Sequence, residues 1–345
     1  MFYPFRSVFR DTAVTEIRTV RKRRRTRLLR YIDILGPWAG VILFTMVMAS
    51  QTPAFLSLPN IRNILVDASG YIILAVGMTF VITGAGIDLS VGSILTLSGV
   101  TLGMLVKHTP IDPILAMVVC LAVGAFLGLV NGLIITKLKM PDFIATLATM
   151  IAYRGITLVI VGGLVLFGFP KSMVYLGQAR LWGIIPVAII AAFLVVLVAD
   201  FLYKRTRFGR YTVAIGGNRT AAIHAGIAVA RYKIYTYIFS GFLAALAAIM
   251  LIGRLDSYHG TFGTGMEIHT IAAVIIGGTA LYGGIGRLWG SLAGAILISM
   301  VINGMVLLRL QYFWQQVAVG VVIILAVMLY TVTGLRESRG VGGMG

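Results

Sequence analysis

The residues that could carry catalytic chemistry are few in this 345-residue chain and lie far apart in the sequence. Its single cysteine, Cys120, lies within an apolar run, which excludes a disulfide framework and a cysteine-rich metal site. No Gly-Lys dipeptide occurs, so the phosphate-binding loop of ATP-hydrolysing proteins is missing. The four histidines show no H-x-x-x-H spacing: His108, His224, His259 and His269. We therefore expect no catalytic residue, metal site or cofactor here, and any ATP and magnesium would act in a partner chain.

A polar, glycine-rich segment at residues 84–93, GAGIDLSVGS, separates two apolar runs. Glycines allow sharp turns and a close approach of helices. Asp88 is suited to cap the helix that follows, by accepting hydrogen bonds from its first backbone N–H groups. The segment is therefore either a capped turn between two helices or an element of a solute path, because broken helices with polar ends often line transport sites.

Hydroxyl and amide side chains are interleaved with glycine in the first half of the chain. A polar solute would need such donors and acceptors along its path. The alternative is that they bond to their own backbone or to a neighbouring helix, as Ser and Thr usually do in membrane helices. The candidates for a path or gate are Thr79, Thr83, Asp88, Ser90, Ser93, Asn131 and Glu267, with Thr96 and Ser98 as further hydroxyl groups.

Two charged residues, Asp67 and Arg154, are expected at membrane depth. Arg154 lies about twelve residues into its apolar run, where a charge is costly and needs a partner or water. Asp67 and Asp88 are its nearest candidate partners by depth. An ion pair between Arg154 and one of them would either hold the helices together or line a solute path. Glu267 falls at the outer end of its run, which is compatible with an interfacial position.

The elements that must position these residues are membrane helices. The chain is 59% hydrophobic and only 12% charged, with a mean hydropathy of +0.97. Its apolar runs are continuous over roughly 20 residues, the length of a membrane-spanning helix. We predict an all-α polytopic membrane protein of about ten spans, which cover residues 34–52, 64–84, 88–106, 114–136, 143–162, 184–203, 233–253, 269–284, 289–308 and 315–334.

The distribution of lysine and arginine predicts the orientation of these spans. With both termini in the cytoplasm, inner segments carry 22 of the 29 cations and outer loops carry 6, with Arg154 inside a span. The net charge of +18 therefore follows topology and does not indicate nucleic acid. We divide the chain into a basic N-terminal segment (1–33), a transmembrane domain (34–335) and a cytoplasmic tail (336–345). The run at 21–27 anchors the topology or binds anionic lipid heads.

The largest inner loop, residues 204–233, contains a short predicted helix. Asn218 is suited to its N-cap and Gly226 to its stop, with the small residues Ala221 and Ala222 between them. Such a helix either inserts into a cleft of a partner protein or rests on the membrane surface as a linker.

Several motifs resemble one family of transport proteins. The segment 84–93 is similar to the Gly-x-Asp-Leu-Ser-x-Gly signature of sugar permeases of bacterial ABC importers, of the ribose, xylose, arabinose and galactose type. Residues 75–82 (AVGMTFVI), 141–147 (PDFIATL), 154–155 (RG), 271–279 (IAAVIIGGT) and 283–286 (GGIG) also resemble that family. The resemblance covers roughly residues 60–335 in the expected order. The chain has Glu267-Ile-His269 where family members commonly have Glu-Leu-Asp.

The resemblance implies a permease subunit that moves a simple sugar across the bacterial inner membrane by alternating access. A separate ATPase would dock on the inner loop, through Gly216, Gly217, Asn218, Ala221, Ala222 and Gly226. A periplasmic sugar-binding protein would deliver the solute, and a second permease copy or a similar chain would complete the pore. The alternatives are an ABC permease for nucleosides, a sugar-like signal or branched-chain amino acids. An ion-coupled secondary transporter would need more buried carboxylates than the chain offers.

Overall fold

The computed structural model describes residues 35–311, 313–321, 324 and 328, and these form a helical bundle with two small two-stranded sheets. Seven helices are long and apolar enough to cross a membrane: α2 (Leu58–Thr83), α3 (Val91–His108), α4 (Pro113–Lys137), α5 (Asp142–Val161), α7 (Val187–Arg205), α10 (Val229–Leu255) and α12 (Leu288–Leu307). Two shorter apolar helices span Leu35–Gln51 and Met266–Ile276, the second being α11. The chain is thus an all-α polytopic membrane protein.

These helices agree with most of the predicted spans but not with all of them. The span predicted at 269–284 is wrong beyond Ile276, where α11 ends. Gly277 and Gly278 turn the backbone there, with Gly278 at a φ of 82°, and no helix resumes before Leu288. The last predicted span, 315–334, lies mostly outside the described residues. The count of ten spans therefore stays a prediction.

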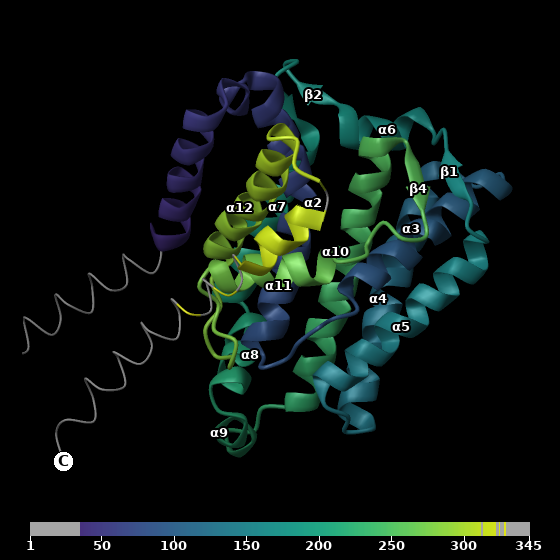
Figure 1. Cartoon of the computed structure of the whole chain (residues 1–345). Helices are drawn as coiled ribbons and strands as arrows, with labels where there is room; N and C mark the ends of the chain where they lie inside the picture. Colours follow the sequence, from purple (N-terminus) through teal and green to yellow (C-terminus); the bar gives the residue numbers. More distant parts are fainter. Residues whose placement is uncertain (1–34, 312, 322–323, 325–327, 329–345) are drawn as a thin grey trace, which may run out of the picture.

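The centre of the bundle is formed by α2 and α10, the two longest helices (Figure 1). Most residues of α2, α3, α10 and α12 are buried inside the bundle, whereas only a minority of the residues of α4, α5 and α7 is buried. Phe126, Val159 and Phe193 are examples of exposed side chains on these outer helices. A helix that is apolar all round and exposed on one side is suited to face lipid.

Close helix packing depends on a ridge of glycines on α4. Gly124, Gly128 and Gly132 recur every fourth residue and therefore lie on one helix face. A Cβ atom at any of them would clash with the backbone of α10, at Gly241, Tyr237 and Ile234 respectively. This small-residue ridge explains why α4 and α10 pack so closely. The sequence analysis did not single out this spacing.

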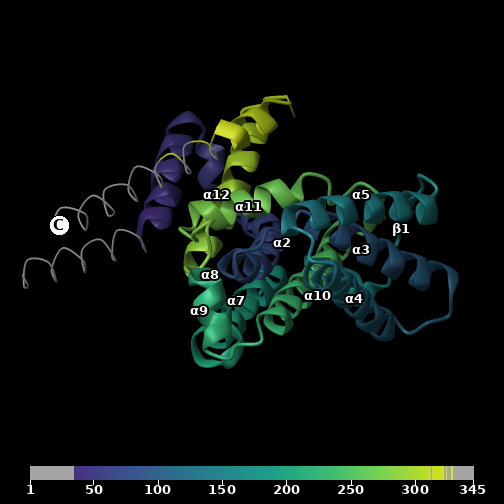
Figure 2. The same ribbon diagram turned by 90° about the horizontal axis from the view of Figure 1, so that it is seen from below.

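The two ends of the bundle differ in structure. At one end lie α6 (Lys171–Gln178) and the two sheets, β1 (Val165–Phe167) with β4 (Ser257–His259) and β2 (Arg180–Leu181) with β3 (Ile185–Pro186), all antiparallel. At the opposite end lie α8 (Arg207–Gly217) and α9 (Arg219–His224), as Figure 1 shows. A short 3-10 helix, η1 (Pro53–Leu56), precedes α2. Figure 2 views the bundle from below.

We expect Gly128→Ala to lower the free energy of unfolding by about 1–3 kcal/mol, because the added methyl group cannot fit against the Tyr237 carbonyl without moving a helix. The measurement is SDS-titrated unfolding in mixed micelles, followed by circular dichroism. The matched control is Gly155→Ala on α5, where a Cβ meets no atom within 4 Å. Equal stability of the two variants would contradict the packing role of the ridge.

Candidate functional site

The polar side chains of the turn between α2 and α3, Asp88 and Ser90, are fully buried and hydrogen-bonded to each other. The Asp88 carboxylate accepts hydrogen bonds from the Ser90 backbone N–H (3.0 Å), the Ser90 hydroxyl (2.6 Å) and the Ser240 hydroxyl (3.0 Å). The expectation that Asp88 caps α3 itself is wrong, because its oxygens close the preceding turn and reach α10 instead. The turn therefore ties the start of α3 to the central helix.

The same network continues into the outer helices. The Asn131 amide on α4 donates to the Ser90 hydroxyl at 2.6 Å, and the Tyr153 hydroxyl on α5 lies 3.4 Å from the Asn131 carbonyl oxygen. Asn131 is fully buried. Four helices thus meet through these polar groups, whose hydrogen-bonding capacity would otherwise go unmet in a water-free interior.

The hydroxyl groups predicted to line a path bond mainly within their own helices. Thr79 donates to the Ala75 carbonyl and contacts the Ser291 hydroxyl at 2.8 Å, while Thr83 donates to the Thr79 carbonyl. Ser93 and Thr96 also donate to backbone carbonyls of the preceding turn. Together with Ser98 they are buried, and none of them lines the cavity between α2, α10 and α11 that is described below. In this conformation these side chains support helix packing.

Arg154 pairs with a different carboxylate from those expected. Its guanidinium lies 2.6 Å from a Glu267 carboxylate oxygen, which joins α5 to the first turn of α11. Asp67 pairs with Arg254 instead, and Asp88 is held by serines. Glu267 is only 5% exposed, so it is buried within the protein, and its depth in the membrane stays a prediction. The sequence could not show this pair because 113 residues separate its members.

The main cavity, of about 580 Å³, opens between α2, α10, α11 and the helical residues 313–321. Its polar wall includes the Asp67–Arg254 ion pair and a second pair in which the Tyr71 hydroxyl lies 3.2 Å from the His269 ring nitrogen Nδ1. Phe262 supplies an aromatic ring. Most of the remaining wall is apolar, among it Val66, Leu95, Met250 and Ile302.

This arrangement is suited to an uncharged solute with several hydroxyl groups. A carboxylate, a guanidinium, a phenol and an imidazole offer both donors and acceptors, and an aromatic face packs against an apolar ring surface. Sequence analysis found Asp67 but missed Tyr71, Arg254 and His269. The spacing of Asp67 and Tyr71, four residues apart on one helix face, was the available signal.

At the opposite end, the predicted inner loop folds as α8 and α9. Asn218 caps α9 by accepting from the Ala221 backbone N–H at 2.9 Å, and Gly226 ends it with a φ of 76°, which confirms both predicted boundaries. Ala222 is buried against the loop itself, whereas Ile223 is 54% exposed. The exposed apolar side chains of α9 are therefore Ala221, which the sequence analysis selected, and the larger Ile223, which it did not.

The loop is firmly attached to the bundle. The Phe208 ring on α8 stacks on Phe80 of α2 with ring centroids 5.1 Å apart. Gly216 packs so tightly against the Thr83 carbonyl and Gly284 that a Cβ atom would clash there, while Gly217 has more space. Displacement of α8 would therefore be transmitted to the end of α2 and to the turn after α11.

Comparisons with known proteins agree with this architecture. Residues 60–332 match a family described as "Branched-chain amino acid transport system / permease component". The chain is 44% identical over 298 residues to the ribose import permease protein of Bacillus subtilis (strain 168), covering 86% of this chain and 92% of that protein.

Two Escherichia coli (strain K12) proteins give similar matches. The ribose import permease protein is 39% identical over 294 residues, covering 84% of this chain and 91% of that protein. The D-allose transport system permease protein is 38% identical over 299 residues, covering 86% of this chain and 91% of that protein. No solved structure matches the chain. The family match extends over most of the transmembrane helices, and the chain belongs to this family of transport-system permease components.

Proposed function

We propose that this chain is the membrane-spanning permease subunit of an ABC importer for a simple sugar of the ribose or allose kind. The observation that carries the proposal is the 44% identity to a ribose import permease over nearly the whole length of both chains. The main cavity supports it, because its paired polar groups and aromatic ring are suited to a neutral polyhydroxyl solute. Branched-chain amino acids, nucleosides or a sugar-like signal are the alternative solutes for the same architecture.

The proposed orientation places the α8–α9 end in the cytoplasm of a bacterium and the two sheets outside its inner membrane. The excess of lysine and arginine on the α8–α9 side supports this orientation. The main cavity, which includes Arg254 near the end of α10 and Gly265 before α11, then lies toward the outer half of the bundle. Sugar would enter it from a soluble binding protein outside.

The proposed power source is a separate ATPase that contacts α9. The exposed Ile223 suits an apolar cleft in such a partner, and the Phe208 and Gly216 contacts would pass its movement to α2. The proposed docking segment keeps the residues expected from the sequence: Gly216, Gly217, Asn218, Ala221, Ala222 and Gly226. Within it, the Asn218 cap and the buried Ala222 also hold α9 in its helical form. Two permease copies, or one copy and a similar chain, would enclose the alternating-access path.

The role of the cavity is tested by filling it. Gly70 lines the cavity, and a Cβ there meets no atom within 4 Å, so Gly70→Leu can fold while its side chain occupies the solute space. We expect uptake of labelled ribose by the reconstituted importer to fall at least about tenfold. Gly155→Leu, equally free of neighbours but outside the cavity, should leave uptake unchanged. Normal uptake by the Gly70 variant would remove the cavity from the path.

The orientation is tested by cysteine labelling of intact cells. Ile223→Cys on α9 should stay unlabelled by a membrane-impermeant maleimide, whereas Tyr175→Cys on α6 should react. The native Cys120 is buried, so it adds no background. Labelling of the Ile223 variant from outside would reverse the proposed topology.

Docking of the ATPase is tested at the same exposed position. Ile223→Glu should abolish co-purification of the ATPase subunit, because a carboxylate replaces an apolar side chain that enters the partner's cleft. Ile223→Leu, which keeps the apolar surface, is the control. Because Ile223 packs little against its own chain, thermal stability should be the same for both variants. Retained ATPase in the Glu variant would show that α9 is not the docking element.

A further inference from the structure

A second cavity, of about 430 Å³, lies at the α9 end of the bundle, where α4, α5, α9 and α10 meet. The end of α4 and the turn after it form one wall, and the first residues of α5, α9 and α10 form the others. Its lining residues are Ile135, Thr136, Lys139, Met140, Pro141, Asp142, Arg219, Val229, Ala230 and Lys233. The proposed transport path does not use this cavity.

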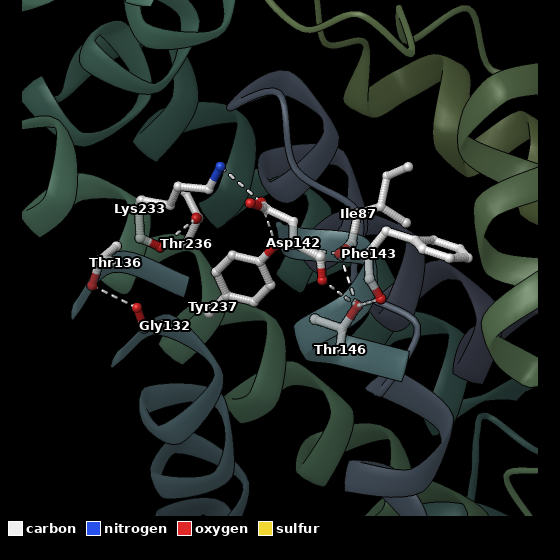
Figure 3. A network of polar contacts seen from close by, with 9 residues as sticks. All are labelled: Ile87, Gly132, Thr136, Asp142, Phe143, Thr146, Lys233, Thr236 and Tyr237. Carbon is white, nitrogen blue, oxygen red and sulfur yellow. Dashed lines mark hydrogen bonds and ion pairs between the residues drawn. The ribbon is translucent and has the colours of Figure 1, made fainter. Parts of the chain in front are cut away.

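The cavity wall has more positive than negative charge. It contains three cations, Lys139, Arg219 and Lys233, and one carboxylate, Asp142. Figure 3 shows that this carboxylate is already engaged. Its Oδ2 atom accepts hydrogen bonds from the Lys233 ammonium at 2.7 Å and from the Tyr237 hydroxyl at 2.7 Å. Lys139 and Arg219 form no ion pair within the described part of the chain, so two uncompensated cations face one cavity.

The local sequence and backbone accentuate this charge. Residues 204–233, which supply Arg219 and Lys233, contain seven cations and no acidic residue. Lys139 has a φ of 55°, in the left-handed region that glycine or asparagine adopts more easily than lysine. A long cation therefore occupies a turn position where a smaller residue would cost less. Strained residues of this kind are concentrated at ligand-binding sites.

The surroundings of the cavity are apolar. Leu138, next to Lys139, is 68% exposed, and Phe143, next to Asp142, is 51% exposed. Ile135 and Met140 line the cavity itself. A ligand with a phosphate head and hydrocarbon chains matches this combination of two free cations and adjoining apolar surface. A fully water-soluble anion would make no use of the apolar part.

We propose that this cavity binds the phosphate group of an anionic phospholipid, with the acyl chains lying along the exposed apolar side chains beside it. Lys139 and Arg219 contact the phosphate, while Lys233 stays paired with Asp142 and holds the start of α10 against the start of α5. Arg219 is the first residue of α9. A phosphate bound by both residues therefore joins the start of α9 to the end of α4. The inference depends on this cavity and not on the identity of the transported solute.

The test is native mass spectrometry of the full-length chain in neutral detergent, titrated with dioleoyl phosphatidylglycerol or dioleoyl phosphatidylcholine. The double variant Lys139→Gln/Arg219→Gln should bind phosphatidylglycerol about tenfold to thirtyfold more weakly, because each cation near a lipid head contributes a severalfold factor. The matched control is Lys137→Gln/Arg231→Gln, which removes two exposed cations nearby that do not line the cavity. Its affinity should change by less than about twofold.

Three results would overturn the proposal. Equal weakening in both double variants would show general surface attraction without a site. If millimolar inorganic phosphate displaced phosphatidylglycerol, and bound to the cavity with the same affinity as that lipid, the cavity would be assigned to free phosphate. Unchanged lipid binding together with loss of the co-purifying ATPase in Lys139→Gln/Arg219→Gln would assign these cations to the partner protein. Selective loss of phosphatidylglycerol, with folding confirmed by an unchanged melting temperature, supports the lipid site.

Discussion

The architecture of this permease depends on the close contact between α4 and α10. In lipid, apolar side chains gain little by moving from solvent into a protein interface, so helices associate through shape and dispersion contacts. Because Gly124, Gly128 and Gly132 have no side chain, the α4 backbone packs directly on α10. Gly241 of α10 likewise packs against the Gly124 backbone of α4. Because α10 also packs on α2, α3 and α6, this contact fixes the centre of the bundle.

Polar groups then determine how the remaining helices are held. Asn60 of α2 and Asn303 of α12 exchange two amide hydrogen bonds, of 3.0 and 2.9 Å. The Asp88 turn and the Arg154–Glu267 pair do the same for α3, α5, α10 and α11. Each of these groups would be costly if it were left unpaired in a membrane interior. Their first function is therefore to specify which helices are neighbours.

The two ends of the bundle have different chemistry, and this difference suits a transporter with partners on both sides. One end carries the sheets and α6, close to a cavity whose polar side chains are already arranged in pairs. The other end carries the cationic α8–α9 loop, attached to the bundle by aromatic stacking and by glycine contacts. A moderately polar cavity is compatible with transport because a solute that binds too tightly would not be released.

The sequence by itself determined that the chain is a helical membrane protein, where most of its helices lie, and where α9 begins and ends. These features are local: apolar length, the Asn218 cap and the Gly226 stop each depend on residues close together in the chain. Several short motifs, found along the chain in the order typical of the family, also indicated the permease family. The short α11 was mispredicted because two glycines within an otherwise apolar run decide where the helix stops.

Only the tertiary structure decided which side chains meet. Arg154 with Glu267, Asp67 with Arg254, and Tyr71 with His269 are joined across more than a hundred residues by helix packing. Hydroxyl groups that looked available for a solute turned out to bond to their own helices, because a backbone carbonyl one turn away is always the nearest acceptor. Burial and pairing depend on the relative rotation of helices, which the residues of one helix alone do not specify.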